Sequence, residues 1–208
     1  MCLHAEVCQN QVIRLTDDIG SVYDATINES TTVYQESQMK STFPISFTTE
    51  HPFFPTLVLN GSHNLLTLNL ASKEVHRISQ DCSYICGKWS PTRANVMYAL
   101  NSEGCLHVYD LLQNDEHPIE IKAVTSTRLI GMDVQVFNFK QYVAMASQDG
   151  ASYNLKLPRE LSKSYPSDGV DFELYLQRLQ KSKGNEHSSI QDVSKPILKY
   201  TVESFFSK

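Results

Sequence analysis

Short runs in which apolar and polar residues alternate fill most of the first 158 positions, and turn-forming residues separate one run from the next. The clearest unit lies between Ile85 and Leu112. Ser90-Pro91 comes before its second run, and Ser102-Glu103-Gly104 comes before its third. Glycine at such a place supplies the positive φ that a tight hairpin demands. The pattern therefore predicts three short strands, at residues 85–91, 95–101 and 105–110.

Three further segments repeat this unit, with turns at residues 20, 64 and 150 in addition to the turn at residue 104. The spacings between successive turns are 44, 40 and 46 residues. A period of about 40 to 45 residues is typical of WD repeats, each of which builds one four-stranded blade of a β-propeller. We therefore expect an all-β fold, a WD-repeat β-propeller with about four partial blades.

The unit around residue 64 has no glycine at its turn. We expect a turn at Ser62-His63-Asn64 all the same, because asparagine can take the left-handed conformation. Fourth strands are expected at residues 74–78 and 119–124, where apolar residues alternate. The repeat is degenerate, since Tyr23-Asp24 and Tyr109-Asp110 stand where Trp-Asp usually closes a blade. Apolar alternation, rather than a buried polar network, is therefore expected to hold such blades together.

The number of blades is small for a ring. Propellers close with about four to eight blades, so four partial repeats leave little margin. The chain is therefore either a small or open propeller or the C-terminal part of a longer one. An unclosed stack of blades exposes a sheet edge and apolar faces, which proteins avoid. We expect the second alternative, part of a larger propeller.

The pattern changes after Leu157-Pro158, and three regions are expected. Residues 1–158 hold the propeller blades, residues 159–184 a connector and an amphipathic helix, and residues 185–208 a polar tail. The tail is either disordered or adds a last strand to a neighbour. Ser167-Asp168 can cap the helix, whose apolar face is expected to pack on its own domain rather than on a partner. The apolar residues at helical spacing are Phe172, Tyr175, Leu176 and Leu179.

Composition and charge narrow the partners. The chain carries a formal net charge of −5 and a pI near 5.8, and its 18 lysines and arginines are scattered. Phosphate-rich partners need clustered cations, so nucleic acid is not an expected partner. No run approaches the ~18 apolar residues that span a bilayer, so membrane insertion is not expected. Five cysteines at irregular spacing favour reduced thiols and the cytosol.

Candidates for catalysis or metal binding are weak. Cys82 and Cys86, together with His76 and His107, offer the ligand types of a zinc site. A structural zinc site needs its ligands paired on tight turns, so small buried residues on strands are the preferred interpretation. We predict no catalytic, metal-binding or cofactor-binding residues, no cofactor and no enzymatic activity. Four acidic residues at turns are expected to make local hydrogen bonds: Asp17, Asp18, Glu103 and Asp149.

Six residues are the candidates for a structural or interaction role. Trp89, the single tryptophan, is expected to fill space between blades, as large aromatic residues do in sheet cores, rather than to be a surface hot spot. Arg93 lies in the loop after that strand. It is the better candidate for a surface contact, although a solvated loop arginine is the commoner case. The other four are Tyr109, Asp110, Phe172 and Leu176.

The segment Trp89-Ser90-Pro91-Thr92-Arg93, followed by Tyr109-Asp110-Leu111-Leu112-Gln113, resembles the propellers of dynein intermediate chains. Their blades carry Trp-Ser-Pro and then a strand that ends in Tyr-Asp-Leu or Trp-Asp-Leu. The resemblance covers residues 43–180. It is strongest to the first intermediate-chain type of cytoplasmic dynein 2, the intraflagellar transport motor, to which Arg128-Leu129 and the helix at residues 171–179 are also similar.

The resemblance implies a non-catalytic subunit of a dynein motor complex. Such a subunit docks on the dynein heavy chain, associates with other dynein intermediate and light chains, and supports retrograde intraflagellar transport and cilium assembly. The implied location is the cytoplasm, the cytoskeleton and the cilium. The repeat pattern alone leaves one alternative open, a generic WD-repeat scaffold or adaptor in another multiprotein complex.

Overall fold

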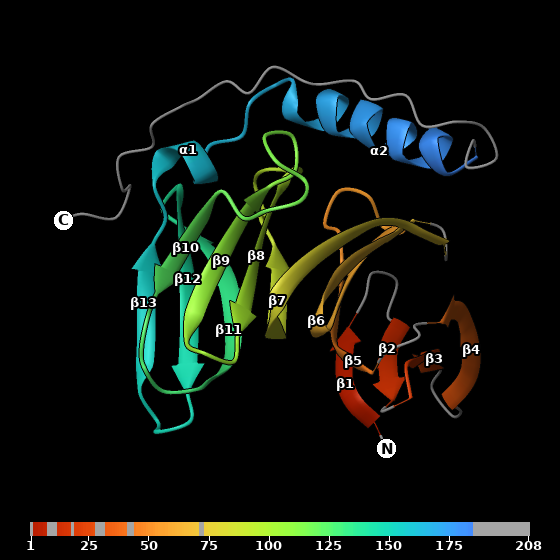
Figure 1. Cartoon of the computed structure of the whole chain (residues 1–208), viewed down its shortest axis with the longest axis horizontal. Coiled ribbons are helices and arrows are strands. Elements are labelled where there is room, and N and C mark those ends of the chain that lie inside the picture. Colours follow the sequence, from red (N-terminus) through yellow and green to blue (C-terminus); the bar gives the residue numbers. More distant parts are fainter. Residues whose placement is uncertain are drawn as a thin grey trace.

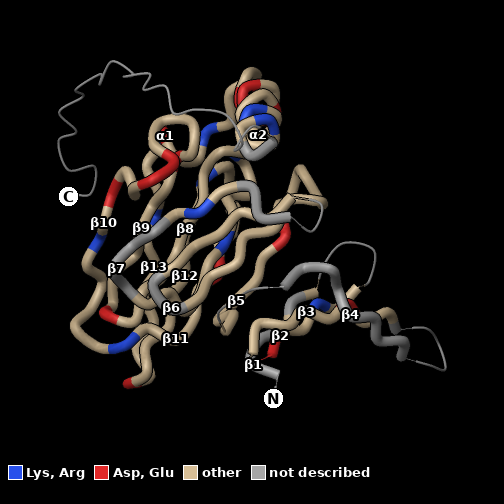
Figure 2. The backbone as a smooth tube through the Cα atoms, turned by 45° about the vertical axis from the view of Figure 1, so that its right-hand side comes forward, with Lys and Arg blue, Asp and Glu red and all other residues tan. Residues whose placement is uncertain are grey.

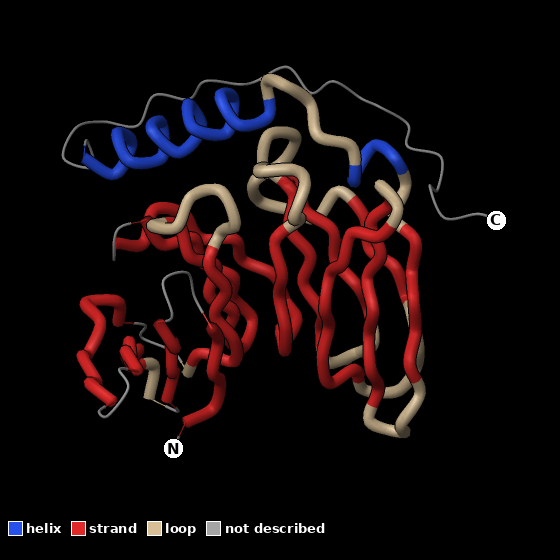
Figure 3. Tube along the Cα trace, turned by 180° about the vertical axis from the view of Figure 1, so that it is seen from behind, coloured by secondary structure: helices blue, strands red, loops and turns tan. Residues whose placement is uncertain are grey.

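Three antiparallel sheets follow one another in chain order as an open arc, and two helices lie across one end of it (Figure 1). The view from behind shows the same end, where loops from the sheets meet the longer helix (Figure 3). The predicted tail at residues 185–208 lies outside the described part of the chain. This computed structural model describes residues 2–7, 12–17, 19–27, 32–40, 44–70 and 73–184.

The first sheet has four strands in the order β1-β2-β3-β4. Gly20 takes a φ of +88° between β2 and β3. Beside it, Asp17 accepts hydrogen bonds from the backbone N–H groups of Ile19 and Ser21, at 3.1 and 2.7 Å. The turn predicted at residue 20 is confirmed, and glycine adopts this φ at no steric cost. The strands are β1 (Cys2–Val7), β2 (Val12–Asp17), β3 (Ser21–Ile27) and β4 (Thr32–Lys40).

The second sheet is six strands wide, in the order β10-β9-β8-β7-β6-β5. From Tyr84 onward it is a complete four-stranded blade, in which Gly104 turns β8 into β9 at a φ of +83° and β10 pairs with β9. The strands predicted at residues 85–91, 95–101, 105–110 and 119–124 are therefore confirmed. The six strands are β5 (Ile45–Glu50), β6 (Leu57–Leu70), β7 (Lys73–Trp89), β8 (Val96–Asn101), β9 (Cys105–Asp110) and β10 (Glu120–Ala123).

The turn expected at Ser62-His63-Asn64 is wrong. β6 continues through these residues, with its first part paired to β5 and its second part to β7. The strand expected at residues 74–78 lies within β7, so β6 and β7 form one long hairpin. The physical reason is the missing glycine. The other three predicted turns each have a glycine at positive φ, whereas residue 64 is an asparagine that remains within the strand.

The third sheet has three described strands in the order β11-β12-β13. Gly150 takes a φ of +86° in the turn before β13, which confirms the turn predicted at residue 150. β11 lies against β7 and β8 of the second sheet, so β13 is the outer edge of the arc among the described residues. The strands are β11 (Leu129–Phe137), β12 (Lys140–Ser147) and β13 (Ser152–Lys156).

Polar side chains organise these turns, although not always the expected ones. Asp149 accepts a hydrogen bond from the Ser147 hydroxyl and another, of 3.2 Å, from a backbone N–H, as predicted. At the Gly104 turn Asn101, and not Glu103, accepts two backbone N–H groups, at 3.1 and 2.8 Å. The expectation for the Glu103 carboxylate is therefore wrong, because the amide oxygen of Asn101 already fills that role. Asp18 lies outside the described residues.

Two helices follow the third sheet. α1 (Arg159–Ser162) is a single turn that the sequence pattern did not predict, and α2 (Asp168–Gly184) is the predicted amphipathic helix. Phe172 and Leu176 are 0% and 4% exposed and belong to the core of the second sheet. Tyr175 and Leu179 pack beside them. The apolar face of α2 therefore packs on its own fold, as predicted.

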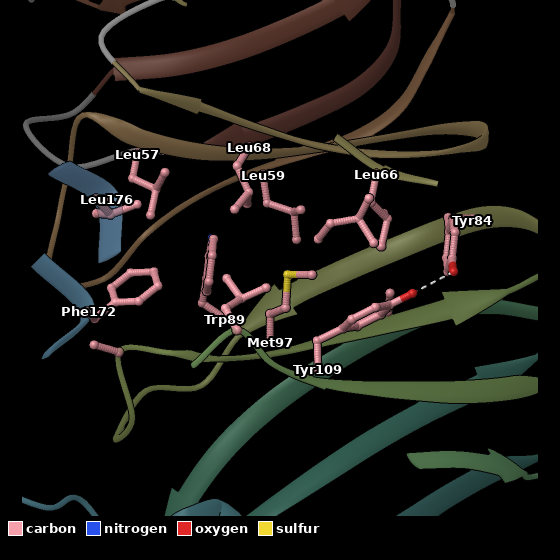
Figure 4. Packing of buried hydrophobic residues seen from close by; sticks show 14 of the residues in the cluster. Leu57, Leu59, Leu66, Leu68, Tyr84, Trp89, Met97, Tyr109, Phe172 and Leu176 are labelled. Carbon is pink, nitrogen blue, oxygen red and sulfur yellow. Dashed lines mark hydrogen bonds between the residues drawn. The ribbon is translucent and has the colours of Figure 1, made fainter. Parts of the chain in front are cut away.

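Alternating residues of β8 face two different apolar clusters. Met97 and Ala99 point into the first cluster, which α2 closes at one end (Figure 4), and Tyr98 and Leu100 point into the second, which joins β8 to β11 and β12. Period-two alternation buried on both faces is what a sheet between two neighbouring sheets requires. Blade packed on blade in this way, followed by a short helix, is part of a WD-type β-propeller.

One aromatic ring packs closely over the backbone of two glycines. The Phe47 side chain of β5 lies over Gly61 of β6 and Gly87 of β7. A Cβ on Gly61 would stand 2.0 Å from the ring, and a Cβ on Gly87 would stand 2.3 Å from it. Phe47 is 1% exposed, so the ring has no room to move away without disturbing the core. The two glycines are therefore required for close approach and not for a turn.

Replacing Gly61 or Gly87 by alanine should lower the free energy of unfolding by about 1 to 3 kcal/mol, the usual cost of an overpacked core. Gly131→Ala is the matched control, because nothing lies within 4 Å of the Cβ it would add. Urea unfolding followed by tryptophan fluorescence measures the difference. Trimming the ring in the double variant Phe47→Leu/Gly61→Ala should recover part of the loss. Equal stabilities of Gly61→Ala and Gly131→Ala would contradict this account.

Candidate functional site

Four of the six candidate residues lie where α2 crosses the loops that follow β7 and β9 (Figure 1), and they are Trp89, Arg93, Asp110 and Phe172. We call this place the helix–blade junction and define it by Trp89, Arg93, Asp110, Asp168 and Phe172. The remaining two candidates pack in the apolar cluster directly beside it, and they are Tyr109 and Leu176.

The Arg93 guanidinium is the charged centre of the junction. Its Nε and Nη2 lie 3.1 and 3.4 Å from the two carboxylate oxygens of Asp168, at the start of α2. Its Nη1 donates to the Glu160 carbonyl at 2.7 Å and lies 3.4 Å from the carboxylate of Asp110. The ring of Tyr165 lies 5.3 Å from the guanidinium carbon. One side chain thus joins the blade to both helices, as the planar fork of arginine permits.

Asp110 ends β9, at the place where a WD repeat has its aspartate. Its Oδ1 accepts the Asn95 side-chain amide at 2.6 Å and the backbone N–H of Leu112 at 3.2 Å. Its Oδ2 accepts the Gln113 amide at 3.0 Å. The side chain is 1% exposed. These bonds, with Arg93 beside them, supply the partners that a buried carboxylate needs.

Three rings form the apolar side of the junction. The His51 ring lies 4.5 Å from the Trp89 ring and 5.5 Å from the Phe172 ring, between centroids. Trp89 and Phe172 lie 6.3 Å apart, and the indole N–H of Trp89 donates to the Thr49 carbonyl at 3.4 Å. These separations are within the favourable range for aromatic pairs. Trp89 therefore fills the space between β5, β7 and α2.

His51 is a buried, neutral histidine. Its Nε2 lies 2.8 Å from the Ala94 carbonyl, and its Nδ1 accepts the backbone N–H groups of Phe53 and Phe54, each at 3.0 Å. This pattern assigns the proton to Nε2. Burial lowers the pKa of His51 to about 4, although the hydrogen bond to Ala94 acts in the opposite direction. The ring is therefore uncharged near neutral pH.

The residues between Trp89 and Arg93 shape the loop and hold α1. The Ser90 hydroxyl oxygen accepts the backbone N–H groups of Thr92 and Arg93, at 3.3 and 3.1 Å, which makes a compact turn. The Thr92 hydroxyl donates to the Ser162 carbonyl at the end of α1, at 2.7 Å. The segment 89–93 therefore contacts both C-terminal helices.

The candidate residues are interior residues. The exposed fractions of Trp89, Arg93 and Asp110 are 5%, 8% and 1%. The expectation of a surface or solvated position for Arg93 is wrong, because two carboxylates and a carbonyl from distant parts of the chain surround its charge. Tyr109 is fully buried, and its hydroxyl lies 2.8 Å from that of Tyr84 (Figure 4). These residues therefore shape the fold from inside and do not themselves form a surface.

The neighbouring surface is hollowed between α2 and the loop after β9. A groove of about 210 Å³ lies there. We call it the α2 groove. Leu112 and Leu174 on its walls are 38% and 45% exposed, although both are large apolar residues. The lining residues used below are Leu112, Asp115, Asp171, Leu174, Tyr175 and Arg178.

The sequence pattern missed His51, Asp168 as the partner of Arg93, and the α2 groove. A signal existed for His51. Aligned on the repeat, His51-Pro52 stands in the place of Ser90-Pro91, so both positions begin the same loop of successive repeats. The other two arise from residues 56 to 75 positions apart, which no local pattern brings together.

Both histidines of the zinc hypothesis make hydrogen bonds within the fold. His76 Nε2 lies 2.6 Å from the Asp115 carbonyl, and His107 Nδ1 lies 3.2 Å from the Tyr84 hydroxyl. Burial raises the pKa of the Cys86 thiol. Among the described residues no group of three or more potential metal ligands was found, and the side chain of Cys82 lies outside them.

Charge and hydropathy add little to the site. Lysines, arginines and acidic residues are spread over the described backbone without a patch of one sign (Figure 2). No helix within the described ranges is both long enough and apolar enough to span a bilayer. The folded chain therefore offers packing and hydrogen bonding at the junction, and a mixed apolar and acidic surface at the α2 groove.

The fold and the junction define the class: a segment of a WD-repeat β-propeller whose last described blade is followed by a helix that packs back on the blades. No family model matches the chain. Curated proteins do match it. Dynein axonemal intermediate chain 3 of Homo sapiens is 27% identical over 96 residues, which are 46% of this chain, and the Mus musculus protein is 27% identical over 135 residues, or 61%.

A flagellar protein matches as well. The 70 kDa intermediate chain of the flagellar outer-arm dynein of Chlamydomonas reinhardtii is 26% identical over 106 residues, or 51% of this chain. The matched regions are 11%, 14% and 18% of the human, mouse and algal proteins, so the chain spans less than a fifth of these relatives. The chain is thus similar to dynein intermediate chains over 46% to 61% of its length.

Arg93→Met should lower the free energy of unfolding by about 3 kcal/mol, because it leaves two buried carboxylates without their cation. Arg93→Lys should recover only part of this loss, since a single ammonium cannot reproduce the two-pronged contact with Asp168. Hydrogen exchange should show the loss first in the amides of α2. The exposed Arg128→Met is the matched control. Unchanged protection of α2 in Arg93→Met would refute the role of the ion cluster.

Stability should fall with acid in a window set by His51. Its pKa is about 4 in the folded chain against 6.5 for an unperturbed histidine, so the unfolded chain binds the extra proton. The free energy of unfolding should therefore decrease by about 3 kcal/mol as the pH falls from 6.5 to 4. Burial lowers the pKa of His107 too, which adds to the same trend. Denaturation measured at several pH values should show a shallower slope for His51→Gln than for the unmodified chain.

Proposed function

We propose that this chain is the propeller part of a non-catalytic dynein intermediate-chain subunit, which docks on a dynein heavy chain and works at the cytoskeleton of a cilium or flagellum. The carrying observation is the match to four dynein intermediate chains over 46% to 61% of the chain. The junction supports it physically, since the residues of the quoted motif hold a helix on a blade and so present a rigid surface.

The sequence motif and the matched relatives point to different dyneins. The segments at residues 89–93 and 109–113 favour the intraflagellar transport motor, dynein 2, and with it retrograde transport and cilium assembly. The matched relatives are named as axonemal or flagellar outer-arm proteins. We retain the intraflagellar role as the hypothesis drawn from the motif and give the axonemal role as the candidate favoured by the relatives.

Tagging the protein at its own gene in ciliated cells, followed by mild extraction and quantitative mass spectrometry, tests the proposal. A dynein heavy chain should co-purify in near-equal amount with the tagged protein. The heavy-chain isoform then separates an axonemal from an intraflagellar role. Recovery in a stable complex that holds no dynein heavy chain would refute the proposal and favour the generic scaffold.

A further inference from the structure

We propose that the α2 groove binds a basic, amphipathic segment of a partner protein. One apolar side chain of the partner lies between Leu112 and Leu174, and a neighbouring lysine or arginine pairs with Asp115 and Asp171. This inference goes beyond the proposed function, because it holds for whichever complex the protein joins.

The apolar walls of the groove are the first observation. Leu174 is 45% exposed and Leu112 is 38% exposed, and Val170, one helical turn before Leu174, is 61% exposed. Residues four apart lie on the same side of a helix, so Val170 extends the apolar strip along α2. The opposite side of α2 buries Phe172 and Leu176. α2 therefore carries a second, smaller apolar strip that the described fold leaves uncovered.

The acidic rim is the second observation. Asp115 and Asp171 line the groove, and neither carboxylate has an ion pair within the described residues. Arg178, the one basic lining residue, lies one helical turn after Leu174 and seven residues after Asp171, so it offsets one of the two acidic charges. The groove thus has a surplus of negative charge next to exposed leucines. A cation on a long aliphatic stem, as in lysine or arginine, complements both features at once.

An unpaired hydroxyl is the third observation. Tyr175 lies on the groove wall, and its buried hydroxyl is close to the Asp115 carboxylate but has no well-formed hydrogen bond among the described residues. Burial raises the pKa of Tyr175, and the neighbouring Asp115 carboxylate raises it further. A buried polar atom without a partner costs free energy, and a backbone or side-chain group of a bound segment removes that cost.

The dimensions and charge exclude other occupants. A volume of about 210 Å³ is below the range of about 300 to 1,000 Å³ typical of small-molecule pockets, but it holds one or two side chains. Anionic lipid headgroups and nucleic acid would be repelled by the two carboxylates. The groove offers only two carboxylates as metal ligands, and hard cations take six or more oxygen ligands. Of the occupants considered, a peptide segment with a basic side chain fits the groove best.

Fluorescence anisotropy with two labelled helical peptides of about 15 residues tests the proposal, since that length supports a helix. Both peptides carry leucines on one face. Lysines flank the leucines in the first peptide, and glutamates flank them in the second. The full chain should bind the lysine peptide at least about tenfold more tightly than the glutamate peptide. In the double variant Asp115→Lys/Asp171→Lys this preference should reverse.

A charge-matched control separates the groove from the overall charge. Asp133→Lys/Glu173→Lys changes the net charge equally at exposed sites outside the groove, and it should keep the original preference. Leu174→Ser should weaken both peptides, whereas Ile121→Ser, on the exposed face of β10, should not. Thermal melts confirm that each variant is folded.

Three outcomes overturn the proposal: no binding of the lysine peptide, equal loss in the two double variants, or binding only after residues 185–208 are removed. The last outcome would assign the groove to the chain's own end. None of the three affects the heavy-chain test, because peptide binding and co-purification are independent measurements. Loss of the heavy chain with an intact groove would remove the proposed function and leave this inference standing.

Discussion

The buried ion cluster around Arg93 is the interaction on which the rest of the structure depends. A guanidinium in the interior is costly unless its hydrogen bonds are satisfied, and here they are satisfied by Asp110 from the same repeat, Glu160 from α1 and Asp168 from α2. Because the partners come from separate parts of the chain, the cluster forms only when the helices lie in one position. That position brings Phe172 onto Trp89 and His51 and closes the end of the first apolar cluster.

Packing between blades sets a second constraint. β8 is buried on both faces, so each of its side chains must fit a neighbouring residue. A contrast between a polar and an apolar face therefore cannot determine which way the strand faces. Orientation comes instead from the turn at Gly104 and from Asp110 at the end of β9. In the second sheet the Phe47 ring takes the space that a side chain on Gly61 or Gly87 would need. Glycine therefore has two different roles here. At residues 20, 104 and 150 it allows the chain to turn, and at residues 61 and 87 it leaves space for the Phe47 ring.

The motif that resembles dynein intermediate chains has a structural explanation that does not require contact with a partner. Trp89, Thr92 and Arg93 each contact the C-terminal helical segment, and Ser90 shapes the loop that holds them. The side chains of Trp89 and Arg93 are buried. Their consequence at the surface is indirect, since they decide where α2 lies and therefore which of its faces remains open. The α2 groove is the surface that this positioning creates, with exposed leucines beside two carboxylates.

The sequence by itself determined the local elements. Glycine spacing predicted three turns, apolar alternation predicted the blade from Ile85 to Ala123, and helical spacing predicted α2, because each of these depends on residues close in the chain. It failed at Ser62-His63-Asn64, where two continuous strands pair with each other instead of turning. Only the tertiary structure decided that Arg93 is buried, that His51 joins β5 to α2 and that the groove exists. Each of these depends on contacts between residues far apart in the chain, and such contacts produce no periodic pattern in the sequence.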